Sequence, residues 1–225
     1  DYVIVKIPRW NFDKFKGAND TLGLQMKSVG EVMAIGRSFT EAIQKACQSL
    51  ENNAVGLGYY GKSLMRAEEL LEYIKTPKWD RLFRIKDALQ AGISVSSISK
   101  ATNGIDRWFL YEIQKIVNLE KELAKYSLEE LPIELLEEAK VEGFSDEQIA
   151  RIVRNGDEDA VYEKRKKAGI TRVYKMVDTC AAEFEAKTPY FYSTFENTAA
   201  ANALLHNESI RSDKKKIIVL GSGPN

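Results

Sequence analysis

The sequence predicts a mainly α-helical domain flanked by short strands, and three observations support that prediction. Helix caps and glycine stops divide residues 38–168 into consecutive segments with apolar residues at helical spacing. Strand-like stretches are short: residues 2–7 and 172–178 alternate with period two, and residues 190–195 are rich in aromatic and β-branched residues. The 225 residues are 44% hydrophobic and 29% charged, which is the composition of an ordinary water-soluble globular protein.

The two terminal segments resemble strands of α/β domains. Residues 2–7 alternate and end at Pro8, and residues 216–220 (KIIVL) form the apolar run of a strand buried on both faces, followed by GSGPN. In doubly wound domains such a strand leads into a glycine turn and a helix that faces a phosphate. Neither strand has a plausible partner within residues 40–170. The sequence therefore predicts a piece of a longer polypeptide, whose terminal strands are disordered or pair with one another or with a neighbouring chain.

The helical segment begins at a capping box formed by Ser38 and Glu41. Ser63 is expected to cap the second helix, and Pro77 to occupy the first turn of the third. The first helix places Ala42, Ile43, Ala46, Cys47 and Leu50 on one face. The later helices are expected at residues 63–74, 77–91, 93–101, 105–126, 132–141, 145–154 and 157–168. The apolar stripe of the longest is expected to comprise Trp108, Phe109, Ile113, Ile116, Val117 and Leu123.

The helical segment repeats itself. Residues 92–100 (GISVSSISK) resemble residues 143–151 (GFSDEQIAR) at an offset of 51. The pair Asn103-Gly104 recurs as Asn155-Gly156 at an offset of 52, and each pair precedes a helix that contains a tyrosine. A glycine followed by a capping serine is also a generic helix boundary. Together with the Asn-Gly recurrence, an internally duplicated helical unit is the better interpretation.

After Gly169 the pattern changes to two extended arms at residues 172–178 and 190–195, followed by a polar linker at residues 197–212 that contains His206. The arms are rich in aromatic residues. Packing against an adjacent domain is the favoured role of these aromatics, with a ligand surface as the alternative. They are Tyr174, Tyr190, Phe191, Tyr192 and Phe195.

Composition and motifs exclude several functions. A formal net charge of zero disfavours a dedicated nucleic-acid binder, and no run approaches the ~20 apolar residues of a membrane span. Two distant cysteines and one histidine indicate a cytoplasmic protein without Cys/His metal chemistry. Cys47 and Cys180 are expected to be small buried residues, and the paired glutamates to be solvated helix faces: Glu68, Glu69, Glu129, Glu130, Glu137 and Glu138. We predict no catalytic, cofactor-binding or metal-binding residue.

Several stretches carry a family resemblance. Residues 6–15 (KIPRWNFDKF) and 25–37 (QMKSVGEVMAIGR) resemble the end of the first ATP-grasp domain of the carbamoyl phosphate synthetase large subunit. Residues 105–110 (IDRWFL) and 173–184 (VYKMVDTCAAEF) resemble that family's helical connection, or oligomerisation, domain, and residues 218–225 (IVLGSGPN) resemble the opening strand of the second synthetase half. Order and spacing match across essentially the whole chain.

The resemblance implies three parts. Residues 1–37 would be the C-terminal edge of the first ATP-grasp domain, residues 38–205 the helical connection or oligomerisation domain, and residues 206–225 a linker and the truncated start of the second half. Arg9, Lys27 and Glu31 would belong to the ATP-grasp edge, either near its site or as edge structure. A stand-alone helical protein-interaction module is the alternative from another class.

The resemblance also implies an activity for the parent protein. The family is an ATP-dependent carbon–nitrogen ligase that makes carbamoyl phosphate from bicarbonate, glutamine-derived ammonia and two ATP, for arginine and pyrimidine biosynthesis. ATP with Mg or Mn would bind outside these 225 residues, and the fragment alone is expected to be inactive. The implied partners are a glutaminase small subunit and other copies of the large subunit, which would associate through the helical domain. Neither nucleic acid nor a membrane is implied.

Overall fold

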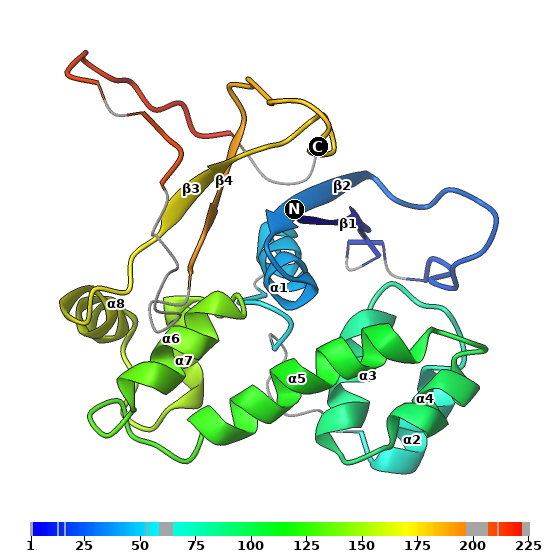
Figure 1. Cartoon of the computed structure of the whole chain (residues 1–225). Helices are drawn as coiled ribbons and strands as arrows, with labels where there is room; N and C mark the ends of the chain where they lie inside the picture. The colour runs from blue at the N-terminus through cyan, green and yellow to red at the C-terminus, as the bar shows by residue number, and fades with distance from the viewer. Residues whose placement is uncertain are drawn as a thin grey trace.

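The computed structural model describes residues 2–12, 14–15, 17–52, 54–58, 65–196, 207–210 and 212–221. Within these ranges the chain forms eight helices and two small two-stranded antiparallel sheets (Figure 1). The mainly α-helical fold class is therefore confirmed. Among the described helices, none has the length and apolar composition needed to cross a membrane.

The first strand has a partner, contrary to the sequence prediction. β1 (Val3–Arg9) pairs antiparallel with β2 (Gly30–Gly36), in a register that sets Val3 opposite Gly36 and Arg9 opposite Gly30. Val32 and Ala34 of β2 alternate toward the helices and are buried. Pro8 lies inside β1 rather than at its end. An edge strand tolerates proline, and in the described part of the chain β1 pairs with β2 alone.

The predicted strand at residues 216–220 does not form. Residues 215–220 adopt neither helix nor strand, and Ile217 and Val219 are 92% and 88% exposed. An apolar strand of this kind is stabilised by neighbours on both sides. None of the described strands pairs with it, so the run stays outside both sheets and its side chains are exposed. Most of the following turn, residues 222–225, lies outside the described residues.

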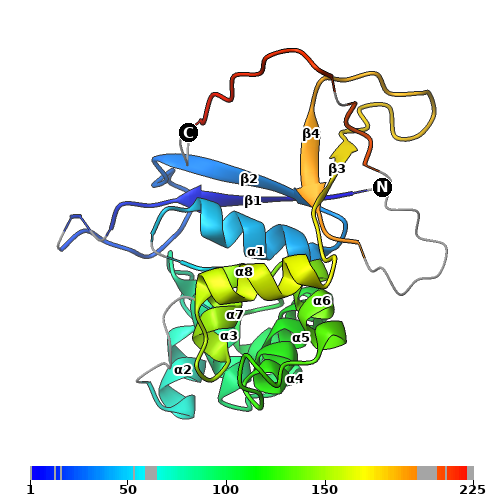
Figure 2. The ribbon, with the colours of Figure 1, turned by 90° about the vertical axis from the view of Figure 1, so that its left-hand side faces the viewer.

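Helix α1 (Phe39–Ser49) lies directly beneath the β1–β2 sheet, between that sheet and the other helices (Figure 2). The Ser38 hydroxyl accepts a hydrogen bond from the Glu41 backbone N–H at 3.1 Å, as the cap predicts. The Glu41 carboxylate, however, accepts from the Arg37 N–H, so the capping box is only half formed. The expected apolar face is buried, at Ala42, Ile43, Ala46, Cys47 and Leu50.

The remaining helices follow the predicted order with shifted ends. α3 is N-capped at Asp80 instead of starting at Pro77, because residues around Lys78 form a bridge to Thr21. Ser63, the predicted cap of α2, lies outside the described residues. The bounds are α2 (Ala67–Tyr73), α3 (Arg81–Gln90), α4 (Val95–Ala101), α5 (Arg107–Leu123), α6 (Ile133–Val141), α7 (Asp146–Ile152) and α8 (Glu158–Lys167).

The structure shows the helical duplication directly. α3–α4–α5 and α6–α7–α8 repeat with an offset of 51 residues, measured at the starts of α4 and α7 and of α5 and α8. Gly92 and Gly143 end the first helix of each unit with φ of +87° and +88°. Ser94 and Ser145 then cap the next helix through backbone N–H groups three residues later. Equivalent capping geometry in both units supports duplication over coincidence.

The arms form a second sheet. β3 (Val173–Met176) pairs antiparallel with β4 (Phe191–Thr194), which also contacts β2. Tyr192 and Phe195 are buried within the chain, whereas three of the five arm aromatics are exposed: Tyr174, Tyr190 and Phe191. Residues 197–206 of the predicted linker, His206 included, lie outside the described residues.

One hydrophobic core joins strands and helices. It includes Val32 and Ala34 of β2, the inner residues of helices α1 to α8, and Phe195 after β4. The strand segments are therefore packed onto the helical unit.

Candidate functional site

The three residues assigned to the ATP-grasp edge make local contacts. The Lys27 ammonium donates to the backbone carbonyls of Asn19 and Thr21, at 3.0 and 2.6 Å. Glu31 forms an ion pair with Lys6 on the paired strand, and the Arg9 carbonyl accepts from the Val29 N–H. These contacts hold the β1–β2 connection in place. The structure brings none of the three into the cavity described next.

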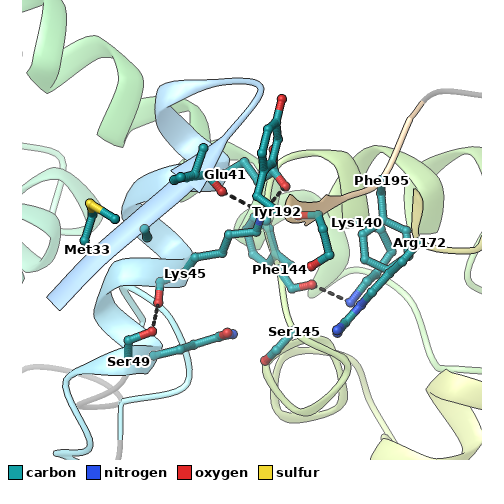
Figure 3. Close-up of a pocket in the computed structure, with 15 residues that line it drawn as sticks. Met33, Glu41, Lys45, Ser49, Lys140, Phe144, Ser145, Arg172, Tyr192 and Phe195 are labelled. Atoms are coloured by element: carbon teal, nitrogen blue, oxygen red, sulfur yellow. Dashed lines mark hydrogen bonds and ion pairs between the residues drawn. The ribbon is translucent and has the colours of Figure 1, made fainter. Parts of the chain in front are cut away.

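A cavity of about 320 Å³ lies where β2, α1, the turn before α7 and β4 meet (Figure 3). Four segments that are far apart in the sequence therefore line the same cavity. The polar part of its lining includes Glu41, Lys45, Lys140, Ser145, Arg172 and Ser193. We refer to it as the junction cavity.

Glu41 and Lys45 connect the elements around the junction cavity. They form an i,i+4 ion pair of 2.6 Å on α1, in which the Glu41 side chain is 2% exposed. The Lys45 ammonium also donates to the carbonyls of Ile35 in β2 and Ser193 in β4, at 2.9 and 2.5 Å. The Thr194 hydroxyl donates to Glu41 at 3.0 Å. The first helix thus joins both sheets through charge-assisted hydrogen bonds.

A second ionic cluster lies on the other wall. The Lys140 side chain is 2% exposed, and its ammonium donates to Asp146 and to the Phe144 carbonyl, at 2.7 and 2.6 Å. Arg165 of α8 also binds Asp146, at 2.8 Å. Burial lowers the pKa of Lys140 to about 8, against the opposing attraction of Asp146. Burial would raise the pKa of Asp146, but Lys140 and Arg165 outweigh it and hold that pKa below its usual value.

The cysteine and glutamate predictions are partly corrected. Cys47 is fully buried, as predicted, and burial raises the pKa of its thiol. Cys180 is only half-buried, because it lies in the loop between β3 and β4. Glu137 is 7% exposed and belongs to the buried face of α6, whereas the other paired glutamates are exposed as predicted. Across the described residues no three His, Cys, Asp or Glu side chains form a group able to hold a metal ion.

The start of α5 presents an aromatic surface, which we define as Trp108, Phe109 and Tyr111. These side chains are 51%, 44% and 55% exposed, so the prediction that Trp108 and Phe109 belong to the buried stripe is wrong. Both rings pack against Phe39 at the start of α1, with centroids 5.3 and 5.5 Å away. The buried stripe instead begins at Leu110. Spacing alone could not separate the outer face from the inner one.

The ionic residues of the junction are not among the site residues predicted from the sequence. The repeat offers the one local signal, since Lys140 occupies the position that Leu89 holds in the first unit, 51 residues earlier. A lysine replacing a buried leucine marks a place where the second unit has a different neighbour. That neighbour is the end of β4, because Phe195 lies 5.0 Å from the Lys140 ammonium.

Comparison with known proteins gives a consistent picture. Residues 31–169 match the family described as the carbamoyl-phosphate synthetase large chain, oligomerisation domain. The whole chain aligns with large chains of carbamoyl phosphate synthase from Archaeoglobus fulgidus, at 51% identity, and from a Nostoc species, at 45%, and covers 20% of each.

A shorter relative shows the same match. It is the "Carbamoyl phosphate synthase large chain, N-terminal section" of Methanopyrus kandleri, which is 49% identical over 89% of this chain and 38% of its own length. This chain spans about a fifth of the length of the full-length relatives named above. The family match covers more than half of the 225 residues. The chain therefore belongs to the carbamoyl phosphate synthetase large chain family and carries its oligomerisation domain.

Proposed function

We propose that this segment is a non-catalytic scaffold that joins the two synthetase halves of a large chain and mediates its self-association. The family match over residues 31–169 supports the proposal, and so does the hydrophobic core that includes β2, the helices and Phe195, the residue after β4. A scaffold must fix the relative positions of the elements on either side of it, and a close-packed core is rigid enough to do so. On this proposal residues 38–205 are the helical domain, between the ATP-grasp edge and the start of the second half.

The parent protein's chemistry is part of the same proposal. Its relatives are named carbamoyl phosphate synthase, so we infer an ATP-dependent carbon–nitrogen ligase that uses bicarbonate and glutamine-derived ammonia. ATP with Mg or Mn, and a glutaminase small subunit, would bind parts of the large chain outside this segment. Carbamoyl phosphate made in this way would serve arginine and pyrimidine biosynthesis, in the cytoplasm.

The observation that best supports self-association is the aromatic surface of α5. Trp108 and Phe109 occupy positions that are Asp159 and Ala160 in the second unit, 51 residues later. The fold therefore does not need aromatic residues there. Exposed aromatic clusters are enriched at protein interfaces, and this one lies within the matched oligomerisation domain. The proposed occupant is a second copy of the chain.

Sedimentation velocity across a concentration series tests this proposal. We expect the chain to associate, and the double variant Trp108→Asp/Phe109→Ala, which carries the residues of the second unit, to become monomeric. Removing an aromatic cluster at an interface centre costs about 2 kcal/mol or more, so dissociation should be evident. Circular dichroism would establish that the variant keeps its helices.

Tyr162→Ser is the matched control, since Tyr162 is an exposed tyrosine at the position equivalent to Tyr111. It should associate as the original chain does. A chain that remains monomeric at every concentration would contradict self-association through this segment. Unchanged association of the double variant would show that another surface carries it.

A further inference from the structure

The junction cavity has an excess of positive charge. Lys45, Lys140 and Arg172 line it, and Glu41 is its only lining carboxylate among the described residues. With Asp146, which binds Lys140, and Arg165, which binds Asp146, the cluster holds four cations and two carboxylates. Two of the four cations, Lys140 and Arg165, are buried and share the single carboxylate of Asp146, whereas protein interiors normally pair each buried charge.

Three of these cations converge on one aromatic ring. The Lys140 ammonium and the Arg165 and Arg172 guanidinium groups lie 5.0, 5.5 and 5.6 Å from the centroid of Phe195. Figure 3 shows the Lys140 and Arg172 side chains ending beside this ring, on the side of Ser145. Cation–π attraction is worth only about 1–2 kcal/mol, whereas like charges at this separation repel one another. Burial is the main cause of the lowered pKa of Lys140, and the positive charges of Arg165 and Arg172 lower that pKa further.

Side chains with unused hydrogen-bond donors line the same cavity. Arg172 makes no hydrogen bond or ion pair with any residue that the structure describes, so its five N–H groups are available. Lys140 uses two of its three N–H donors on protein oxygens. The Ser145 hydroxyl oxygen accepts from the Gln148 N–H, which leaves its own proton to donate.

We propose that the junction cavity binds a small oxyanion of the phosphate type, held by the Arg172 guanidinium, the Lys140 ammonium and the Ser145 hydroxyl. A planar guanidinium binds tetrahedral oxyanions through two parallel hydrogen bonds. The volume of about 320 Å³ is roughly ten times the ~30 Å³ share of a water molecule, so an oxyanion and several waters fit. Bound there, the anion would offset the excess positive charge of the cavity and tie the α6–α7 turn to the start of β3.

Calorimetric titration of the chain with inorganic phosphate tests the site, in a chloride buffer of constant ionic strength. We expect saturable binding that weakens at least tenfold in Arg172→Gln. Arg172 is exposed at the rim of the cavity, so this variant should fold normally. Thermal unfolding gives a second readout, since an ion that binds only the folded state raises the melting temperature.

Arg107→Gln is the matched control, because Arg107 is an exposed arginine on α5, away from the cavity. Its phosphate affinity should equal that of the original chain. Equal, non-saturating heats in all three proteins would mean an adventitious ion only and would overturn the proposal. Saturable binding with unchanged affinity in Arg172→Gln would show that phosphate binds elsewhere, and would overturn the proposal for the junction cavity. Neither result bears on self-association, which the aromatic surface tests independently.

Discussion

Lys140 places a charge where the first helical unit has an apolar side chain. Its counterpart Leu89 is 1% exposed and packs in the core. The lysine is tolerated because Asp146 and the Phe144 carbonyl satisfy its ammonium, but burial still disfavours the charged form. The second unit therefore carries an electrostatic cost that the first does not, and the cost depends on pH.

The Lys140 pKa predicts how stability changes in alkaline solution. The pKa falls from 10.5 in the unfolded chain to about 8 in the folded protein, so between these values the unfolded state binds the extra proton. Raising the pH from 8 to about 10 should then stabilise the original chain relative to Lys140→Met by about 2 kcal/mol. Urea unfolding of both proteins across this range measures the difference.

The difference in unfolding free energy between the original chain and Lys140→Met cancels the contributions of the other groups that titrate in alkaline solution. Burial raises the pKa values of Cys47 and Tyr73, and these groups lower stability equally in both chains as pH rises. Leu89→Met, the equivalent change in the first unit, should show no pH-dependent difference from the original chain. A constant difference between the original chain and Lys140→Met would show that Lys140 titrates normally in the folded protein.

At the scale of elements, the two units end their first helix in the same way but meet different surroundings. Gly92 and Gly143 both adopt the left-handed conformation that lets a helix stop and the next begin. A Cβ on Gly92 would meet nothing within 4 Å, whereas a Cβ on Gly143 would lie 2.7 Å from the Glu41 Cα. At this turn, therefore, the second unit lies against the backbone of α1, whereas the equivalent turn of the first unit does not.

Alanine substitution should separate the cost of the left-handed backbone from the cost of the close contact with α1. Gly92→Ala pays only the left-handed strain, about 1 kcal/mol, whereas Gly143→Ala adds a backbone clash of about 1–3 kcal/mol more. Chemical denaturation of the two variants gives both values on one scale. Equal losses of stability would mean that α1 moves aside without cost and that the contact is not a close one.

Helix ends were largely predictable from sequence, because caps are local. Ser94, Ser145 and Gly92 each act through residues within one or two turns, and the structure confirms them. The pairing of β1 with β2 and the exposure of Trp108 were not predictable in the same way. Both features depend on which distant part of the chain packs against the segment, and a single sequence does not specify that partner. The junction residues were missed for the same reason, since Glu41 and Thr194 are 153 residues apart.

At the scale of the whole molecule, hydrogen bonds of Lys45, Thr194 and Tyr2 link the β3–β4 hairpin to α1 and to the start of the chain, within the residues that the structure describes. Lys45 is central among them, because one ammonium bonds to β2, to β4 and to Glu41 on its own helix. Elements joined by few contacts open more readily than the core. The β3–β4 sheet should therefore be the part of the fold whose stability depends most on this side chain.

Hydrogen exchange of Lys45→Met tests that dependence. Loss of the bond to Ser193 should speed exchange of the β3–β4 amides, for example the Val177 N–H bonded to the Tyr190 carbonyl, by about tenfold, or roughly 1.4 kcal/mol. The amides of α5 should keep their rates. Lys115→Met is the matched control, because Lys115 is an exposed lysine on α5 whose ion pair with Glu112 lies within one helix, and such pairs contribute little. If Lys45→Met sped exchange throughout the helical core as well, the sheet and the helices would open together as one cooperative unit, and Lys45 would support the whole fold.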